Sequence, residues 1–237
     1  PFENSDIQFA FQPIVDTFRA RVSSIEALIR SNDGRYPETI LEELVGLEKY
    51  DFDLKSKAIA IKQGAALLSS DQSLSINLCP RAITSTVNVA DYLHELVKRN
   101  KLKPQQLVIE VTETEIISES DTFYQAIEQI RSRGMRVAID DFGAGYAGLS
   151  LLADFTPDKI KLDRKITTGI HESGHRQAIT EAVLEFANSM GIPLVVEGVE
   201  TIDEWLWLQH AGVQRFQGFL FAKPKLNGVS GIDFSFD

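Results

Sequence analysis

The sequence predicts an α/β fold, and within that class a (β/α)8 TIM-like barrel, from three observations. Short apolar runs alternate with longer amphipathic stretches, as in parallel strands joined by helices. Eight such runs occur, the strand number of a closed barrel, in a chain of 237 residues, close to the usual length of one barrel domain. Hydrophobic residues make up 43% of the chain, which is enough to fill a core and excludes a disordered protein. An open parallel sheet is the alternative arrangement of the same elements.

Strands and helices are expected in alternating order. The strands are expected at Gln8–Val15, Val22–Ile29, Leu74–Leu78, Leu107–Val111, Arg136–Asp140, Lys159–Leu162, Pro193–Glu197 and Val213–Leu220. The helices are expected at Thr39–Leu47, Leu54–Leu68, Ala90–Arg99, Phe123–Arg133, Arg176–Met190 and Ile202–His210, with a further short helix in Gly148–Asp154. Gly134, Gly191 and Gly212 each follow a helical pattern, where a helix end requires the left-handed backbone that glycine allows.

The connection between the first two strands is short. Only the segment Asp16–Arg21 joins them, which is too few residues for a helical crossover. We therefore expect the first pair to be antiparallel within an otherwise parallel barrel.

Composition excludes several classes of protein. Acidic residues outnumber basic ones 34 to 24, and the net charge of −10 repels duplex nucleic acid. Cys79 is the only cysteine, so no disulfide forms within the chain and a cytoplasmic location is expected. No apolar run reaches the roughly 18 residues that span a membrane. Since the chain begins at Pro1 rather than Met, we expect one barrel domain of a larger protein, which could be membrane-anchored through another segment.

Polar side chains stand at the carboxyl ends of six predicted strands. They are Glu26, Asn77, Glu110, Asp140 with Asp141, Lys161 with Asp163, and Glu197. In a parallel barrel these ends open on one face, where barrel enzymes have their active sites. Any single acid in such a position is usually a helix cap or a solvated loop residue. Carboxylates gathered from six strand ends would instead need compensating positive charge, and divalent cations are its simplest source.

The ligand type limits the metal. Every candidate ligand is an oxygen, and no Cys or His stands at a predicted strand end, which favours hard cations such as Mg²⁺ or Mn²⁺ over zinc. The adjacent pair Asp140 and Asp141 suits two cations with one bridging carboxylate. Two metals roughly 3.5–4 Å apart are suited to in-line attack on phosphorus.

The same residues also lie in motifs of a known family. The motifs are Gln12-Pro13-Ile14-Val15, Glu26-Ala27-Leu28-Ile29-Arg30, Asn77-Leu78-Cys79-Pro80, Glu110-Val111-Thr112-Glu113, Asp140-Asp141-Phe142-Gly143, Lys161-Leu162-Asp163, Glu197-Gly198-Val199-Glu200 and Gln217-Gly218-Phe219. In this order and spacing, over nearly the whole chain, the sequence resembles the EAL domains, whose signature is residues 26–28. Departures from the family pattern, such as Ala144, Ala147 and Gly148 in one loop, remove no metal ligand.

The resemblance implies a role for each matched residue. The implied metal ligands are Glu26, Asn77, Glu110, Asp140 and Asp141, with Asp140 bridging two metals. The residues implied to act in catalysis are Lys161, which would orient or deprotonate the attacking water, Glu197 and Asp141. The residues implied to bind substrate are Arg30, Gln12, Gln217 and Asp163. The residues implied to support the loop after Asp141 and the metal site are Glu113 and Glu200.

The activity implied by the resemblance is a metal-dependent phosphodiesterase that hydrolyses cyclic-di-GMP to linear pGpG. It would use two divalent cations, Mg²⁺ or Mn²⁺, and no organic cofactor. The family also implies a homodimer and an attached sensory domain in the full protein. The alternative is a catalytically silent relative that serves as a cyclic-di-GMP receptor or a protein-interaction module.

Two other motifs point to different chemistry. Residues 143–148 fit G-x-G-x-x-G, and Asp163 follows about 20 residues later, as in nicotinamide dehydrogenases. Against this, two acids precede the motif and it falls in the middle of the chain. Residues 171–175 fit the zinc-peptidase pattern H-E-x-x-H, but Gly174 interrupts the helix that such a site requires.

Overall fold

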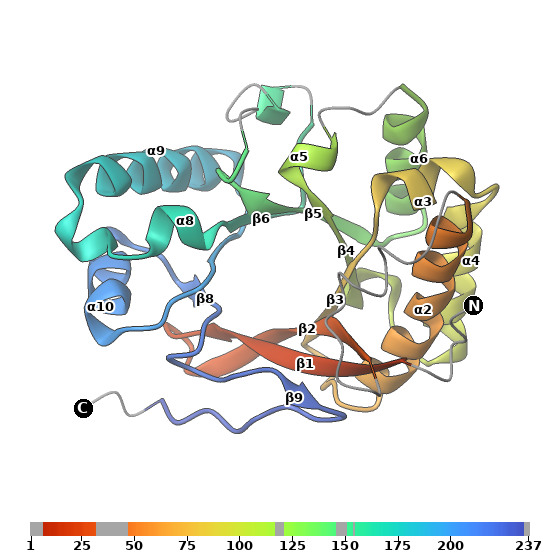
Figure 1. Ribbon diagram of the computed structural model, residues 1–237, viewed down its shortest axis with the longest axis horizontal. Coiled ribbons are helices and arrows are strands. Elements are labelled where there is room, and N and C mark those ends of the chain that lie inside the picture. Colours follow the sequence, from red (N-terminus) through yellow and green to blue (C-terminus); the bar gives the residue numbers. More distant parts are fainter. Residues whose placement is uncertain (1–6, 32–46, 117–120, 146–150, 154, 235–237) are drawn as a thin grey trace.

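The computed structural model describes residues 7–31, 47–116, 121–145, 151–153 and 155–234. Its strands are β1 (Ile7–Asp16), β2 (Arg21–Ser31), β3 (Ser73–Asn77), β4 (Leu107–Thr112), β5 (Arg136–Phe142), β6 (Lys159–Leu162), β7 (Leu194–Val196), β8 (Arg215–Phe216) and β9 (Lys225–Leu226). β1 to β8 close into a barrel, which confirms the predicted TIM-like fold (Figure 1).

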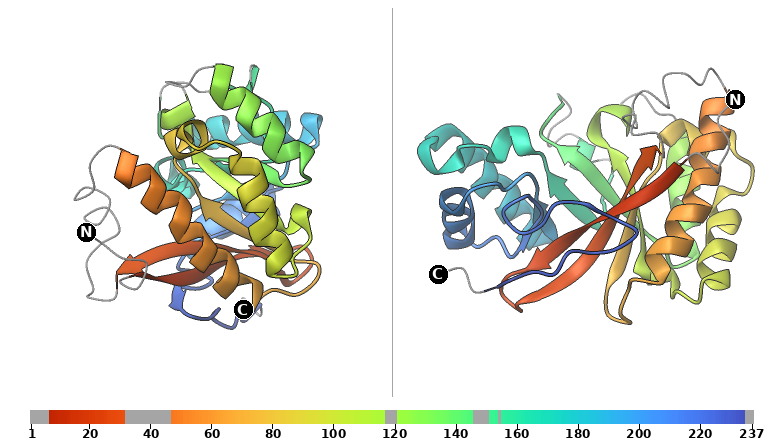
Figure 2. Two further views of the ribbon diagram at one scale, coloured as in Figure 1. Left: turned by 90° about the vertical axis from the view of Figure 1, so that its right-hand side faces the viewer. Right: turned by 60° about the horizontal axis from the view of Figure 1, so that its bottom comes forward.

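Strand direction also agrees with the prediction. β2 to β8 run parallel in chain order, whereas β1 is antiparallel to both β2 and β8. The long β1–β2 ladder extends from the pair Ile7 and Ser31 to the pair Asp16 and Arg21. The contact of β8 with β1 is limited to the end of β1, at Val15 and Asp16. β9 pairs with the same edge of β1 further along, so the segment that contains β9 lies beside β1 (Figure 2).

Helices cover the outside of the barrel (Figure 1). They are α2 (Leu47–Ala65), α3 (Pro80–Ser85), α4 (Val89–Arg99), α5 (Glu113–Ile116), α6 (Asp121–Ser132), α8 (Arg164–Thr167), α9 (Gly174–Met190) and α10 (Ile202–Ala211), with the 3₁₀ turns η2 (Pro104–Gln106) and η3 (Ile170–Glu172). None of the helices in the described ranges is both long and apolar enough to cross a lipid bilayer.

Side-chain alternation along a strand explains how one sequence builds both core and site. In β4, Leu107, Ile109 and Val111 are buried in the main hydrophobic cluster. Val108 and Glu110 alternate with them, so they point to the opposite face, toward the barrel axis. The last inward position of such a strand therefore lies at the barrel mouth.

Several boundaries differ from those predicted. The last barrel strand was expected over Val213–Leu220 but ends at Phe216, because a turn begins at Gly218, whose carbonyl accepts hydrogen bonds from Phe221 and Ala222. β7 is likewise shorter than Pro193–Glu197.

The helix expected over Leu54–Leu68 begins earlier and ends earlier, as α2. The elements α3, α5, α8 and β9 were not predicted, since two to six residues are too few to show a period. The helix expected at Thr39–Leu47 lies outside the described residues except for its last position. Of the one expected in Gly148–Asp154 only residues 151–153 are described, and these are helical.

Candidate active site

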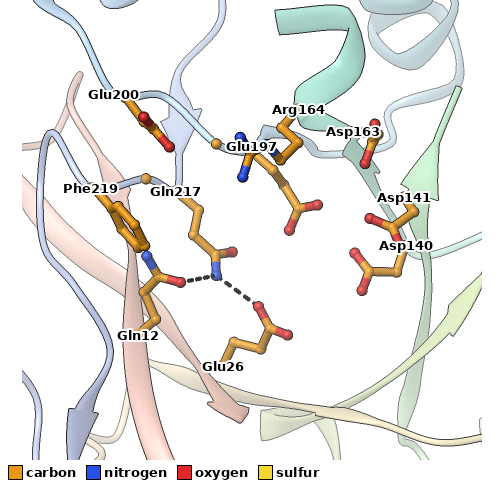
Figure 3. A pocket seen from close by; sticks show the side chains of 12 residues that line it. Gln12, Glu26, Asp140, Asp141, Asp163, Arg164, Glu197, Glu200, Gln217 and Phe219 are labelled. Carbon is orange, nitrogen blue, oxygen red and sulfur yellow. Dashed lines mark hydrogen bonds between the residues drawn. The ribbon is translucent and has the colours of Figure 1, made fainter. Parts of the chain in front are cut away.

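A β-bulge in β5 places two consecutive acids at the barrel mouth. β5 and β6 pair Ile139 with Ile160 but Phe142 with Leu162, so β5 has an extra residue over this stretch. Asp141 has a φ of 52°, in the left-handed region that Asp tolerates better than most residues. In a regular strand Asp140 and Asp141 would point to opposite faces, whereas here both line one cavity (Figure 3).

The buried ammonium of Lys161 is the centre of a carboxylate cluster. Its Nζ lies 3.1 Å from an oxygen of Glu26, 2.9 Å from one of Glu110, 2.9 Å from one of Asp140 and 2.6 Å from one of Glu197. The four acids come from β2, β4, β5 and the residue after β7. Closure of the barrel, rather than local sequence, therefore brings them together.

Burial and crowding shift the pKa values in this cluster. Burial raises the pKa of Glu110 to about 7, with the neighbouring acids adding to the rise and Lys161 opposing it. Burial likewise raises the pKa of Glu197 well above its ordinary value. Burial also acts to raise the pKa of Glu26. The Lys161 ammonium and the hydrogen bonds from Gln217 and Asn77 outweigh it and hold the Glu26 pKa below its ordinary value. For Lys161, burial is outweighed by the four carboxylates, which raise its pKa well above 10.5.

Two overlapping groups of carboxylates have the spacing of metal ligands. Glu26, Glu110 and Asp140 form one, and Asp140, Asp141 and Glu197 form the other, with the ligand oxygens of each group within 4.8 Å of one another. Among the described residues, one oxygen of Glu110 and one of Asp140 are buried without a hydrogen-bond donor in proper geometry. Five ionised carboxylates and one ammonium leave four negative charges, which two divalent cations would neutralise. The residues therefore fit two hard cations sharing Asp140.

A chain of amides fixes the orientation of Glu26. The side-chain amide of Asn77 donates a 2.8 Å hydrogen bond to one Glu26 oxygen, and that of Gln217 donates a 2.7 Å hydrogen bond to the other. The same Gln217 nitrogen donates to the side-chain oxygen of Gln12 at 3.1 Å (Figure 3). The side-chain nitrogen of Gln12 donates in turn to the backbone carbonyl of Ala222. Because the Asn77 nitrogen faces Glu26, its carbonyl oxygen remains available as a metal ligand.

Glu113 lies behind the bulge and contacts the loop that follows it. Its side chain is fully buried, and one carboxylate oxygen accepts hydrogen bonds from the backbone amides of Gly143, at 2.7 Å, and Gly145, at 3.3 Å. Gly143 has a φ of +91°, and a Cβ at Gly145 would stand 3.2 Å from the Glu113 carboxylate. Both glycines are thus required for the loop to wrap this acid.

Comparison with known proteins agrees with this geometry. The family model for the EAL domain matches residues 2–224. The chain belongs to the EAL domain family. Its signature glutamate is Glu26, which lies in both the carboxylate cluster and the amide chain.

Two curated proteins with different named functions resemble the chain. The blue light- and temperature-regulated antirepressor BluF of Escherichia coli is 42% identical over 94% of this chain and 56% of BluF. The cyclic di-GMP phosphodiesterase RocR of Pseudomonas aeruginosa is 30% identical over 94% of this chain and 58% of RocR. This chain thus spans less than three fifths of the length of these curated relatives.

Two solved structures have nearly the same fold as the chain. The manganese and cyclic-di-GMP complex of Klebsiella pneumoniae BlrP1 superposes with a TM-score of 0.92 at 45% identity, over 96% of this chain and 58% of that one. A standalone EAL protein from Vibrio cholerae in its c-di-GMP bound form gives a TM-score of 0.90 at 33% identity, over 98% of both chains.

The cavity at the barrel mouth is also lined by two residues for which the sequence predicted no role in the site. Its volume is about 250 Å³, and Arg164 and Phe219 line it together with the acids and both glutamines (Figure 3). Phe219 is 52% exposed at its rim. Arg164 directly follows the Lys-Leu-Asp motif, and Phe219 ends the Gln-Gly-Phe motif, so the motifs themselves were the available signal.

Two glycines allow the cavity wall to form. A Cβ at Gly198 would lie 2.4 Å from the Cβ of Arg164, and a Cβ at Gly218 would lie 2.0 Å from the backbone oxygen of Val199. A larger residue at Gly198 would push the segment that carries Glu197 away from α8, and one at Gly218 would push the segment that carries Gln217 away from Val199.

Three predicted site residues lie away from the carboxylate cluster around Lys161. The Arg30 guanidinium donates to the adjacent carbonyl of Ile29 at 2.7 Å and is not among the residues that line the cavity at the mouth. Asp163 lines the cavity and caps α8 through the amide of Lys165. Glu200 lines the cavity from an exposed position.

The two rival motifs do not form the sites they suggested. The amides of Gly143 and Gly145, which would face a pyrophosphate in such a motif, donate to the Glu113 carboxylate, and residues 146–148 lie outside the described residues. His171 belongs to the turn η3, whereas His175 belongs to α9, which begins at Gly174, so no single helix presents both.

Proposed function

We propose that this chain is a metal-dependent phosphodiesterase that hydrolyses cyclic-di-GMP to linear pGpG. The observation that carries the proposal is the shared position of Asp140 in two carboxylate groups at the barrel mouth. Membership of the EAL family, together with the cyclic-di-GMP named for its solved relatives, supports the choice of substrate.

The chain offers a ligand set for each of two Mg²⁺ or Mn²⁺ ions. Glu26, Asn77, Glu110 and Asp140 would hold the first, and Asp140, Asp141 and Glu197 the second. When bound, the cations would neutralise the phosphodiester and lower the pKa of the attacking water. No organic cofactor is required.

Lys161 is assigned to orienting the water. A group surrounded by four carboxylates, with a pKa well above 10.5, is an ammonium at neutral pH. It can donate hydrogen bonds but has no lone pair with which to take a proton. Of the two roles considered for Lys161, positioning is the one that its surroundings favour, and its charge would also counter the acids around the reacting phosphate.

Substrate would bind along the cavity wall. The side chains of Gln217 and Gln12 would contact one side of the dinucleotide, and the Asp163 carboxylate would contact the opposite side. The Arg164 guanidinium suits a phosphate oxygen, and the exposed ring of Phe219 suits stacking on a nucleobase. Arg30 would reach a phosphate only after leaving the Ile29 carbonyl.

Glu113 and Glu200 are assigned supporting roles. Glu113 would hold the backbone after Asp141 through the amides of Gly143 and Gly145. Glu200 would support the segment that carries Glu197, three residues before it.

The wider context is also proposed. The chain would form a single EAL-type barrel domain of a longer cytoplasmic signalling protein, joined to a sensory domain, since it spans only part of its curated relatives. A homodimer would form through the region that follows the loop after Asp141.

A silent receptor or regulatory module is the second candidate function. The similarity to BluF, named as an antirepressor, is the observation that favours it. Against it, every implied metal ligand is present, and all lie at the same mouth.

One experiment separates the two. The protein is incubated with cyclic-di-GMP and Mg²⁺, and the products are separated by chromatography, while equilibrium dialysis measures binding. Appearance of pGpG supports the enzyme. Tight binding without pGpG, with Mg²⁺ and with Mn²⁺, would favour the receptor.

A further inference from the structure

A second cavity lies at the opposite end of the barrel from the carboxylate mouth. Its volume is about 320 Å³. Every parallel strand contributes to it at or just before its first residue; the contributing residues are Arg21, Ser73, Gln106, Arg136, Lys159, Pro193 and Arg215. We call this cavity the basal pocket.

The basal pocket is cationic in a chain whose net charge is −10. Its basic residues are Arg21, Lys103, Arg136, Lys159 and Arg215. Its two acids are already paired: Asp71 with Arg21, and Asp158 with Arg131, which lies outside the pocket, at 3.2 Å. Arg215 lies 4.0 Å from Asp16, an acid outside the pocket. Lys103, Arg136 and Lys159 have no such carboxylate partner among the described residues, so an excess of positive charge remains in the pocket.

Lys159 is a buried cation with no carboxylate in contact among the described residues. It is only 9% exposed, and its Nζ makes one long hydrogen bond of 3.4 Å, to the hydroxyl of Ser75. Among the described residues no carboxylate oxygen lies within 4.0 Å of it, in contrast to Lys161, two residues on, which has four. Burial lowers the Lys159 pKa, and the more distant carboxylates of Glu110 and Glu26 oppose this only in part. A buried ammonium without an anion in contact is costly, and an anion bound in the pocket would lower that cost.

A second unsatisfied donor lies in the same pocket. The Nε of Arg21 is buried without an acceptor in the described part of the chain, although its Nη1 pairs with Asp71. Arginine N–H groups match the oxygens of a tetrahedral phosphate, and serine hydroxyls at Ser70 and Ser73 add further donors.

We infer that the basal pocket binds the phosphate group of a small phosphorylated molecule, held by Lys159 and the arginines around it. A dianion suits the excess of cations better than a single carboxylate does. The volume exceeds that of a lone phosphate and is of the order of small-ligand sites, about 300 Å³ or more, so an organic group can accompany the phosphate. This site is separate from the proposed hydrolysis at the mouth.

The test is a calorimetric titration of the whole chain with inorganic phosphate in the presence of a chelator, so that phosphate cannot bind through metal at the mouth. Lys159→Met removes the buried charge at similar length, and Arg136→Gln removes an exposed charge at the rim with little risk to folding. Each should weaken phosphate binding by about tenfold or more, since each removes a charge-assisted hydrogen bond.

Two control variants locate the site. Lys62→Gln removes an exposed cation of α2, outside both cavities, and Arg164→Gln removes an arginine that lines the mouth. Both should leave phosphate binding in the basal pocket unchanged, and any loss seen only with Arg164→Gln would report phosphate bound at the mouth. Absence of saturable binding, equal affinity in all variants, or a loss confined to Arg164→Gln would overturn the inference.

A titration with glycerol 3-phosphate in place of phosphate shows whether the pocket prefers a phosphorylated organic molecule to free phosphate. Binding at least about tenfold tighter than phosphate, and sensitive to Arg136→Gln, would show that the pocket takes a phosphorylated metabolite. Equal affinity would assign it to free phosphate and overturn the part of the inference that concerns the organic group.

Discussion

The backbone amide of Gly143 donates a 2.7 Å hydrogen bond to the buried carboxylate of Glu113. Gly143 stands two residues after Asp141, whose left-handed backbone places its side chain at the mouth. Glu113 thus contacts no proposed metal position, yet it fixes the chain that presents one of the proposed ligands.

Replacing Glu113 should therefore weaken metal binding without removing a ligand. For Glu113→Ala we expect a loss of about 10–100-fold in metal affinity and turnover, because two loop amides lose their acceptor. Glu113→Gln keeps an acceptor oxygen and should lose less. Calorimetric titration with Mn²⁺ measures both variants; unchanged affinity and rate would show that Glu113 has no part in the site.

Glu26→Ala should suppress turnover by roughly 100-fold or more, since this carboxylate is a ligand in the first metal group and the anchor of the Gln217 and Asn77 amides. The fold should persist, because residues at the barrel mouth serve function more than stability. Glu185→Ala, an exposed acid on α9, is the matched control. Near wild-type kcat in Glu26→Ala would contradict the assignment of the signature glutamate.

Lys161→Met should separate binding from chemistry. The variant keeps the length of the side chain but removes the ammonium from among the four carboxylates. We expect cyclic-di-GMP binding to remain while turnover falls by roughly 100-fold or more, and metal affinity to stay the same or rise, since a competing cation is lost. A full loss of metal binding, with folding intact, would count against the positioning role; Lys98→Met on α4 is the surface control.

Metal affinity should depend on pH. In the folded chain the pKa values of Glu110 and Asp141 are raised to about 7, mainly by burial, so both carry protons near neutrality that metal must displace. Affinity should rise between about pH 6 and about pH 8, with proton release on binding. Titration in two buffers of different ionisation enthalpy counts those protons; a flat affinity without release would refute the linkage.

The same shifts affect stability. A carboxyl whose folded pKa is raised binds more protons in the folded than in the unfolded chain. Without metal, the free energy of unfolding should fall as pH rises from near the ordinary values of 4.5 and 3.8 toward about 7. Denaturant unfolding in chelator at several pH values measures this, and saturating Mn²⁺ should remove most of the decline.

The sequence was sufficient to predict the barrel and most of the candidate site, because both follow from the alternation of strands with helices and of side chains along each strand. Alternation placed Glu110 on the inner face of β4, and barrel closure then required the strand-end acids to meet. The short link between β1 and β2 was likewise sufficient to predict an antiparallel pair, which the register confirms.

What the sequence could not show depends on departures from regular geometry. Alternation alone would have placed Asp140 and Asp141 on opposite faces, and only the bulge and the left-handed φ of Asp141 bring both to the mouth. Arg164 was missed because its place in the cavity depends on close packing against Gly198. The position of Arg30 against its own strand also has no signal in the pattern.

The most direct test of the central claim is the rate of pGpG formation from cyclic-di-GMP as metal is removed and returned. In excess EDTA no product should form, and added Mg²⁺ or Mn²⁺ should restore turnover with a dependence on metal concentration steeper than first order, as expected when two ions share Asp140. Ca²⁺ should bind but inhibit, because its longer bonds and looser geometry suit this chemistry less well. Undiminished turnover in EDTA would contradict the account.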